Sequence, residues 1–364
     1  MITLLLKRYR GMILASLLFF YLGCGITLSF IKMECASDIS NLEFRSKNSS
    51  IYEKTEYAVL VISSPDNEMK RDAIRATWAN FINNIFIENG ETLFKWDNSW
   101  LRTNTKTDLI KIFFVIGTQN LEKDKLIKIN NELSRSNDLL LLNKFEDSYE
   151  NLTLKLLYSL DFLSKNLKKL KYVIKCDDDS FVRIDLIVKD LEAFGPKMDD
   201  PSISSYVTYK ETEQNQKGLY WGYFNGRAQV FLNGKWQEKR WFLCDTYLPY
   251  ALGGGYVISH NIVDYISRNL EYLSVYNSED VSMGVWTAAL NGINRVHDIR
   301  FDTQWKSRGC EDNMLIRHKQ NPSDMLKMYK NLIESKGLAL CKSQSVLRKS
   351  YKYNWNVLPS MCCK

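Results

Sequence analysis

The chain has 364 residues, of which 45% are hydrophobic and 25% charged, a length that allows roughly two domains or one large α/β domain. Its formal net charge is +7, and because three positive charges lie within the first ten residues, residues 32–364 carry only +4. These values exclude a disordered chain, which could not supply such a core, and give no reason to expect a nucleic-acid partner.

The N-terminal segment has the pattern of a membrane anchor. Residues 11–31 form an uncharged run that is long enough for a helix to cross a bilayer. The run follows three basic residues, Lys7, Arg8 and Arg10. By the positive-inside rule, this predicts that the short N-terminal tail is cytoplasmic. A cleaved signal peptide is the alternative, but its apolar core usually spans only about 7–15 residues. We therefore expect a type II membrane protein with a tail at 1–10, a transmembrane signal anchor at 11–31, a polar stem at 32–56 and a lumenal domain at 57–364.

Short apolar runs alternate with helical patterns in the first half of the domain. The sequence predicts strands at 57–63, 112–117, 139–142 and 172–176, and helices at 70–78, 122–135 and 151–165. This alternation indicates a parallel sheet covered on both faces, a Rossmann-like α/β fold. No GxGxxG or GxxxxGK[ST] segment follows these strands, so a dinucleotide cofactor and a P-loop ATPase are not expected.

The second half is richer in aromatic residues. Between Tyr220 and Tyr256, 11 of 37 residues are Phe, Trp or Tyr, which either pack in the core or offer flat apolar faces to sugar rings. Asn233-Gly234 predicts a hairpin turn between short strands. Helices are expected at 259–268 and 278–290, the second opening with acidic residues suited to a helix N-terminus.

Cysteines and sequons agree with a lumenal domain. Seven cysteines follow the anchor and none has zinc-like CxxC spacing, so we expect disulfides, with an odd cysteine left over and the pairing open. Cys176 adjoins acidic residues and is not expected to be a disulfide partner. Asn48 and Asn151 begin sequons and are expected glycosylation sites.

Three adjacent acids, Asp177-Asp178-Asp179, follow a predicted strand directly. Ligands of open α/β sheets bind at the carboxyl ends of the strands. Three neighbouring carboxylates repel one another, and a divalent cation such as Mg²⁺, Mn²⁺ or Ca²⁺ relieves that repulsion. A solvated acidic turn is the alternative. The position after an apolar strand favours the metal.

Other polar residues leave two interpretations open. Of the three histidines, His297 lies shortly after the run 292–295 and is the best candidate ligand, although a lone histidine is more often structural. Asp280, in the pair Glu279-Asp280, can serve as a general base or as helix N-terminal charge. The run Gly253-Gly254-Gly255 either brings backbone N–H groups close to a ligand or forms a tight turn.

Taken together, six segments resemble the β1,3-galactosyltransferase family and occur in that family's order. They are Arg71-Asp-Ala-Ile-Arg75-Ala-Thr-Trp78, Phe114-Val-Ile-Gly117, Asp147-Ser-Tyr-Glu-Asn-Leu-Thr-Leu154, Lys175-Cys-Asp-Asp-Asp179, Tyr250-Ala-Leu-Gly-Gly-Gly255 and Ser278-Glu-Asp-Val281. The resemblance runs from about residue 57 to 364. It implies a single GT-A type nucleotide-sugar transferase domain behind the anchor, and a Golgi membrane location.

The resemblance also assigns roles to individual residues. It implies that Asp177, Asp179 and His297 bind Mn²⁺ or Mg²⁺, and that Asp280 is the catalytic base. It places Arg71, Arg75, Asp177, Asp178, Gly254 and Gly255 on the side of the UDP-galactose donor. Trp221, Trp236 and Trp241 are the candidate acceptor-side residues. One base, one metal-stabilised leaving group and no enzyme nucleophile imply single displacement with inversion.

Further segments resemble the branch of the family that builds the proteoglycan linker. They include Leu243-Cys-Asp-Thr-Tyr-Leu-Pro-Tyr250, His297-Asp-Ile-Arg-Phe-Asp-Thr303, Arg308-Gly-Cys310 and His318-Lys-Gln320. They imply transfer of galactose to the 3-hydroxyl of galactose in Gal-Xyl-Ser of heparan and chondroitin sulfate core proteins. The alternatives are a sibling that adds galactose or N-acetylglucosamine to glycolipids or N-glycans, a glycosidase, and an inactive lectin-like protein.

Overall fold

The computed structural model describes residues 19–22, 52–88, 91–94, 109–194, 207–209 and 218–363. The chain divides into two compact units, Met1–Asn41 and Leu42–Lys364, and the second contains the predicted lumenal domain. The predicted anchor at 11–31 and the sequon at Asn48 lie outside the described residues, apart from a short helix at 19–22. No helix among the described residues is long and apolar enough to span a membrane.

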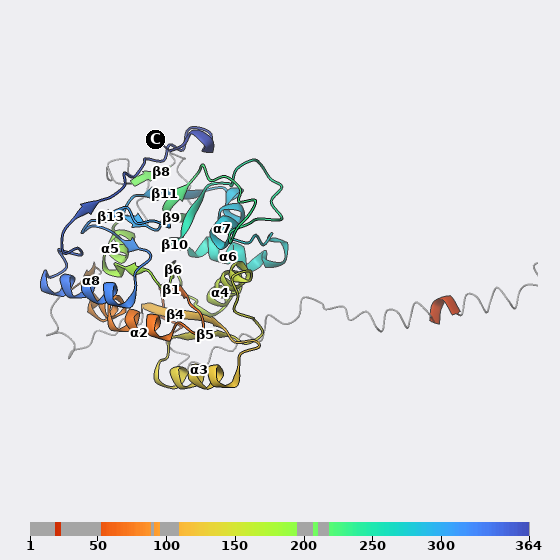
Figure 1. Cartoon of the computed structure of the whole chain (residues 1–364), viewed down its shortest axis with the longest axis horizontal. Coiled ribbons are helices and arrows are strands. Elements are labelled where there is room, and N and C mark those ends of the chain that lie inside the picture. Colours follow the sequence, from red (N-terminus) through yellow and green to blue (C-terminus); the bar gives the residue numbers. More distant parts are fainter. Residues whose placement is uncertain are drawn as a thin grey trace, which may run out of the picture. The chain divides into compact units, whose positions relative to one another are not determined.

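A central eight-stranded sheet organises the second unit (Figure 1). Its order is β5-β4-β1-β6-β10-β9-β11-β8, formed by β1 (Tyr57–Ile62), β4 (Ile110–Gly117), β5 (Leu139–Leu142), β6 (Tyr172–Asp177), β8 (Val207–Tyr209), β9 (Gly218–Asn225), β10 (Tyr250–Ser259) and β11 (Ile293–Asp298). The four neighbours β5, β4, β1 and β6 are parallel to one another, and β10 pairs antiparallel with β6. The predicted α/β fold is therefore confirmed, but the sheet is mixed, because β10 pairs antiparallel with both β6 and β9 and β8 pairs antiparallel with β11, whereas the sequence predicted a parallel sheet.

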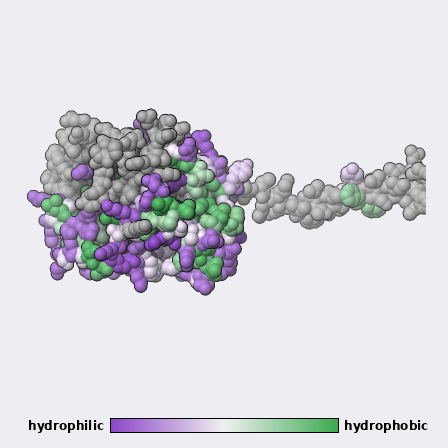
Figure 2. Space-filling view, turned by 90° about the horizontal axis from the view of Figure 1, so that it is seen from above, coloured by the Kyte–Doolittle hydropathy of each residue, from purple (hydrophilic) through white to green (hydrophobic). Residues whose placement is uncertain are grey.

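Helices cover both faces because alternate strand residues point to opposite sides. Val59 and Val61 face a core completed by α2 (Glu68–Ala76), α3 (Lys123–Arg135), α5 (Ile184–Phe194) and α8 (Pro322–Glu334). Ala58 and Leu60 face a second core completed by α4 (Leu152–Asn166), α6 (His260–Arg268) and α7 (Glu279–Ala288). On the face shown in Figure 2, small hydrophobic patches lie among mainly hydrophilic residues.

The smaller elements complete the unit. They are the 3₁₀ helices η3 (Trp78–Asn84), η5 (Leu270–Tyr272) and η6 (Pro359–Met361), and the short strands β2 (Ile85–Glu88), β3 (Glu91–Phe94), β7 (Phe181–Val182), β12 (Phe301–Asp302), β13 (Gly309–Cys310), β14 (Ile316–Arg317) and β15 (Ser345–Val346). The predicted hairpin at Asn233-Gly234 is only half right. Gly234 turns with φ +79°, but no strands flank it, and Phe231 packs on Trp236 and Tyr247 instead.

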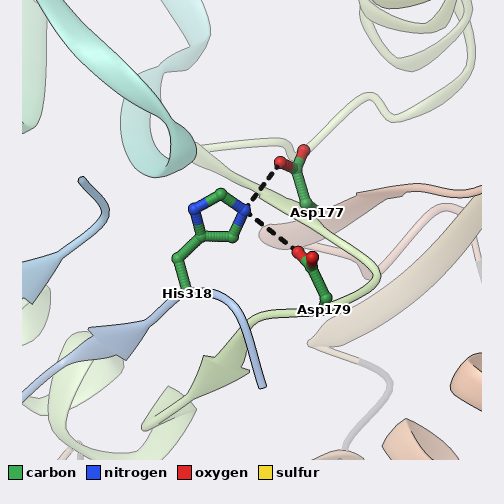
Figure 3. A group of neighbouring side chains, drawn as sticks. All are labelled: Asp177, Asp179 and His318. Atoms are coloured by element: carbon green, nitrogen blue, oxygen red, sulfur yellow. Dashed lines mark ion pairs between the residues drawn. The ribbon is translucent and has the colours of Figure 1, made fainter. Parts of the chain in front are cut away.

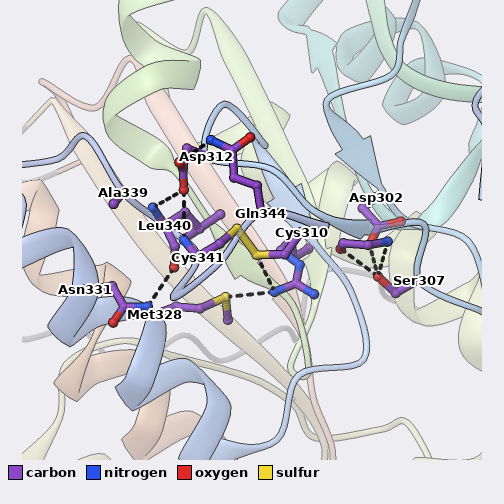
Figure 4. Close-up of a disulfide and its surroundings, with 12 residues drawn as sticks. Asp302, Ser307, Cys310, Asp312, Met328, Asn331, Ala339, Leu340, Cys341 and Gln344 are labelled. Carbon is purple, nitrogen blue, oxygen red and sulfur yellow. Dashed lines mark hydrogen bonds between the residues drawn. A yellow bond between two sulfur atoms is a disulfide. The ribbon is translucent and has the colours of Figure 1, made fainter. Parts of the chain in front are cut away.

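One disulfide braces the C-terminal segment (Figure 4). Cys310 at the end of β13 bonds to Cys341, beyond α8, and Asp312 accepts hydrogen bonds from the Leu340 and Cys341 amides at 2.8 and 2.9 Å. A second disulfide joins the neighbours Cys362 and Cys363. Cys176 is buried and unpaired, as expected, and Cys244 is exposed and unpaired. The 310–341 loop contains His318, so this disulfide limits the movement of that histidine's segment.

Candidate functional site

Two aspartates and a histidine converge at the carboxyl end of β6 (Figure 3). Nε2 of His318 lies 3.2 Å from Oδ2 of Asp177 and 3.0 Å from Oδ1 of Asp179. The histidine follows β14, and its segment is held against the acidic turn because the Gln320 amide donates to the Asp179 carbonyl at 2.7 Å. Sheet β14–β7 thus brings together residues about 140 positions apart in the sequence.

The chemistry of this group fits a divalent cation. The ligand atoms of Asp177, Asp179 and His318 lie within 4.8 Å of one another. Nδ1 of His318 is buried and has no hydrogen-bond partner within the described part of the chain, and Nε2 of His318 and Oδ1 of Asp179 contact only members of this group. Burial opposes the charge on His318, yet the two carboxylates outweigh it and raise its pKa to about 9. Two carboxylates and a histidine that converge on a site favouring positive charge are ligands suited to a metal ion.

Asp178 points elsewhere and ties the acidic turn to the end of β1. It accepts hydrogen bonds from Ser63 Oγ at 2.9 Å, Asn67 Nδ2 at 2.7 Å and Lys70 Nζ at 2.9 Å. The β1 and β6 ends flank the point where the strand order reverses, which is where open α/β sheets bind nucleotides. Asp178 is only 5% exposed, so it connects the ends of β1 and β6 from within the fold.

His297, the predicted third ligand, is not part of the group. It lies fully buried on β11, and its Nδ1 accepts a hydrogen bond from the Phe224 amide at 3.1 Å. Its Nε2 therefore carries the proton and donates to the Tyr351 carbonyl at 3.0 Å. Burial lowers its pKa to about 4 despite these contacts. Because both ring nitrogens are used, this histidine is structural, and the histidine beside the aspartates is His318.

Arg71 and Arg75, predicted to contact the donor, instead form ion pairs within the fold. Arg71 is fully buried and binds both carboxylate oxygens of Glu132 at 2.8 and 2.7 Å. Its Nη1 also donates to Ser63 Oγ and the Ser64 carbonyl. Arg75 pairs with Asp138 and Glu132 at 2.8 and 2.7 Å. Arg71 therefore supports the β1 end from inside.

Breaking the Arg71–Glu132 pair should cost stability. Arg71→Met leaves the buried Glu132 carboxylate with Arg75 as its one remaining ion-pair partner among the described residues. We therefore expect the free energy of unfolding to fall by an amount near the lower end of the about 3–5 kcal/mol that breaking a buried ion pair costs, measured by urea denaturation. The exposed pair of Lys125 and Asp66 is the control, and Lys125→Met should leave the urea midpoint of unfolding almost unchanged. An Arg71 variant as stable as the wild type would contradict the structural role.

The three glycines lie within strand β10 at a register shift between Ala251 and Tyr256. A Cβ at Gly253 would lie 2.5 Å from Glu279 Oε1, and one at Gly254 would lie 2.6 Å from the His318 ring. A Cβ at Gly255 would meet the Ile316 side chain at 2.6 Å. The lack of a side chain at these positions therefore leaves room for the neighbouring side chains of Glu279, His318 and Ile316. Of the two predicted donor-side glycines, Gly254 lines the cleft described below, whereas Gly255 packs against β14.

Asp280 opens α7 and faces the same space. Its Oδ2 accepts a hydrogen bond from the Gly253 amide at 2.9 Å, and its Oδ1 accepts one from its neighbour Val281 at 2.8 Å. Burial and, next, the negative charge of Glu279 raise its pKa to about 7, against the opposing effect of Lys175. A carboxylate with such a pKa is suited to accept a proton near neutral pH.

A cleft of about 550 Å³ joins the two parts of the site. Its lining includes Asp177, Gly254, Asp280, His318 and Lys319. Trp236 and Trp305 stand at the cleft with their ring centroids 5.2 Å apart, and Trp305 is 60% exposed. The arrangement places a cation-binding group, a potential base and exposed aromatic rings around one space.

The three predicted acceptor-side tryptophans have different positions. Trp236 lines the cleft. Trp221 is 2% exposed and donates to Asp298 at 3.0 Å, so it belongs to the core. Trp241 packs on Tyr247 and Tyr276 and does not line the cleft. The sequence analysis missed Trp305, whose flanking polar residues gave no strand or helix signal.

Asn151, the sequon within the described residues, is partly exposed at the start of α4. Its Nδ2 donates to the Glu146 carbonyl at 3.1 Å. Glycosylation there stays a prediction.

A model of the galactosyltransferase family matches residues 69–298. Mouse beta-1,3-galactosyltransferase 6 is 38% identical over 341 residues, covering 94% of this chain and 92% of that protein. Arabidopsis thaliana hydroxyproline O-galactosyltransferase GALT2 is 31% identical, covering 63% and 31% of the two chains. Xenopus laevis UDP-GalNAc:beta-1,3-N-acetylgalactosaminyltransferase 2 is 31% identical, covering 57% and 38%. Apo mouse xyloside xylosyltransferase 1 aligns with a TM-score of 0.32 at 8% identity, covering 72% of this chain and 97% of that one.

Proposed function

Because this chain belongs to the galactosyltransferase family, we propose that it transfers galactose from UDP-galactose to the 3-hydroxyl of the galactose in Gal-β1,4-Xyl-Ser of proteoglycan core proteins. The likeness to a beta-1,3-galactosyltransferase over nearly the whole of both chains supports β-1,3-galactosyltransferase activity. The linker acceptor, which makes the product the second galactose of the heparan and chondroitin sulfate linker, rests on the segments around 243–250 and 297–320. In this proposal the domain works in the Golgi lumen behind an N-terminal anchor.

The observation that carries the proposal is the shared cleft of the acidic–histidine group and Asp280. Asp177, Asp179 and His318 would hold Mn²⁺ or Mg²⁺, which supplies Lewis-acid stabilisation of the charge on the departing diphosphate. The Asp280 carboxylate takes the proton from the acceptor 3-hydroxyl. That oxygen bonds to the anomeric carbon, the bond from this carbon to UDP breaks, and UDP leaves with the electron pair. One displacement inverts the α-linked donor into a β-linked product.

The cleft also suits a glycan acceptor. Trp236 and Trp305 offer apolar ring faces at its edge, and Nζ of Lys319 lies 4.9 Å from the Trp305 ring centroid. Sugar rings pack their apolar faces on such exposed aromatic rings. In the proposed complex, the acceptor lies between these tryptophans and Asp280, opposite the donor at the β1 and β6 ends.

A comparison of sugar donors and acceptors tests both parts of the proposal. A purified fragment of residues 34–364 is incubated with Mn²⁺ and one donor, which is UDP-galactose, UDP-N-acetylglucosamine or UDP-N-acetylgalactosamine. Acceptors are a Gal-β1,4-Xyl peptide, an N-glycan bearing terminal Gal-β1,4-GlcNAc, and lactosylceramide. We expect galactose transfer to the Gal-β1,4-Xyl peptide to exceed every other combination by at least about tenfold in kcat/KM. Preference for another acceptor would keep the family and overturn the linker assignment.

The reaction should depend on pH through Asp280. Below its raised pKa of about 7 the base is protonated, so kcat/KM should fall about tenfold per pH unit, and above it kcat/KM should level off. Initial rates between pH 5 and 9 measure this. A plateau that extends down to pH 5 would contradict the base assignment.

A further inference from the structure

Lys175 places a fully buried positive charge directly beneath the cleft. Its Nζ lies 2.5 Å from the Gly253 carbonyl oxygen, 2.6 Å from Glu279 Oε1 and 2.9 Å from Asp177 Oδ1. The side chain is 0% exposed. A buried ammonium is costly to desolvate and is tolerated only when paired and hydrogen-bonded. Here its three partners come from three different elements, β10, α7 and the end of β6.

These partners reach both halves of the site. Asp177 belongs to the acidic–histidine group, so Lys175 holds one of its oxygens while the other faces His318. Gly253 gives its carbonyl to Lys175 and its amide to Asp280 Oδ2 at 2.9 Å. Glu279 precedes Asp280 on α7. The Lys175 ammonium therefore contacts Asp177 directly. It is linked to Asp280 through two residues, Gly253, whose amide donates to Asp280, and Glu279, which precedes Asp280 in the chain.

We propose that Lys175 is a positioning residue that holds Asp177 and Asp280 in register across the cleft. The inference rests on the proposed function, because it takes Asp280 as the base and Asp177 as a metal ligand. The donor carbon and the acceptor hydroxyl bind between these two groups, and a misplacement of about 1 Å can cost about 10²-fold in rate. Lys175 touches neither substrate in this account and acts only through its partners.

A second consequence concerns the charge on Asp280. Among the described residues, the charged groups that act on this carboxylate are Glu279 on its own helix and Lys175 from β6. The titratable side chains that also interact with it are Tyr149 from the segment before α4, Tyr220 from β9, Tyr247, and Tyr250 and Tyr256 from β10. Glu279 raises the pKa of Asp280 and Lys175 lowers it. Removing Lys175 should therefore move the acid limb of the pH profile upward, and removing the charge of Glu279 should move it downward. If Lys175 merely filled space in the core, removing it would leave the acid limb in place.

The test compares Lys175→Met, Glu279→Gln and the double variant Lys175→Met/Glu279→Gln, in which the lost charges balance. Each is assayed with whichever acceptor the wild type uses, for kcat, KM and the pH profile of kcat/KM. Melting temperature reports folding, and titration calorimetry with UDP and Mn²⁺ reports binding. We expect kcat to fall about 10²-fold in Lys175→Met with KM for UDP-galactose changed less than about threefold, and the acid limb to move up. Glu279→Gln should move that limb down, and the double variant should fold without regaining kcat.

Lys155 provides the matched control. It is also buried, and it pairs with Asp147 at 2.6 Å and with the Ser63 carbonyl, away from the cleft lining. Lys155→Met should lower the melting temperature and leave the acid limb in place.

Wild-type kcat in folded Lys175→Met or in the double variant would overturn the proposal. If Lys175→Met alone fails to fold, the double variant still decides the question. Failure of the linker assignment would appear separately, as a wild type that prefers another acceptor.

Discussion

Replacing Asp280 by Asn is expected to remove galactose transfer and to leave binding of UDP and Mn²⁺ unchanged. The amide keeps the shape of the side chain but cannot take the proton from the acceptor hydroxyl. A positioned general base contributes about 10²–10⁴-fold, so kcat should fall within that range. The remaining activity of the variant should not change with pH near 7, because the group that titrates there in the wild type is gone, so the difference from the wild type should shrink below pH 7. Product formation with a radiolabelled donor and calorimetry with UDP measure the two effects.

Asp324→Asn is the control for this change. Asp324 lies in the first turn of α8 and does not line the cleft, so its variant should keep wild-type kcat and pH dependence. An Asp280→Asn enzyme with wild-type turnover would rule out Asp280 as the base. A wild-type protein that transfers no galactose at all would instead favour the lectin-like interpretation.

The second large effect separates the two histidines. His318→Ala removes a ring nitrogen 3.2 and 3.0 Å from the two carboxylates, so we expect weaker Mn²⁺ binding and a fall in kcat of about 10²-fold or more. His297→Gln alters a side chain whose nitrogens bond to backbone groups. It should lower the melting temperature while leaving Mn²⁺ affinity within about threefold of the wild type.

Calorimetric titration of each variant with Mn²⁺ in the presence of UDP gives the comparison directly. The opposite pattern, with Mn²⁺ affinity lost in His297→Gln and kept in His318→Ala, would restore the ligand set that the sequence alone predicted.

Most of the first half of the fold could be predicted because its signals are local. The run Tyr57–Ile62 is entirely apolar and buried on both faces, and the leucines of α4 repeat at helical spacing. The carboxylates after β6 were found for the same reason, since a strand end is visible in the sequence.

The rest depends on contacts between distant segments. His318 reaches Asp177 only because β14 pairs with β7, and that pairing involves two-residue strands without a periodic signal. His297 was the best candidate ligand from the sequence, but its two ring nitrogens bond to the Tyr351 carbonyl and the Phe224 amide. Arg71 matched a family motif, and only the buried position of Glu132, 61 residues away, shows that it supports the fold.

The glycines of β10 were ambiguous for a related reason. A glycine run reads as a turn or a ligand contact when its surroundings are unknown. Here the space above Gly253 and Gly254 is taken by Glu279 and His318, which arrive from α7 and from the segment after β14. Steric demand of this kind is a property of the assembled site.

The most direct test of the central claim is the linkage and metal dependence of the product. The lumenal fragment is incubated with UDP-galactose and a Gal-β1,4-Xyl peptide, with Mn²⁺ or with EDTA, and the product is analysed by NMR. The account predicts a β1,3-linked galactose that forms with Mn²⁺ and not with EDTA. An α-linked product, or equal amounts of product with EDTA, would contradict the single displacement at Asp280 beside a metal held by Asp177, Asp179 and His318.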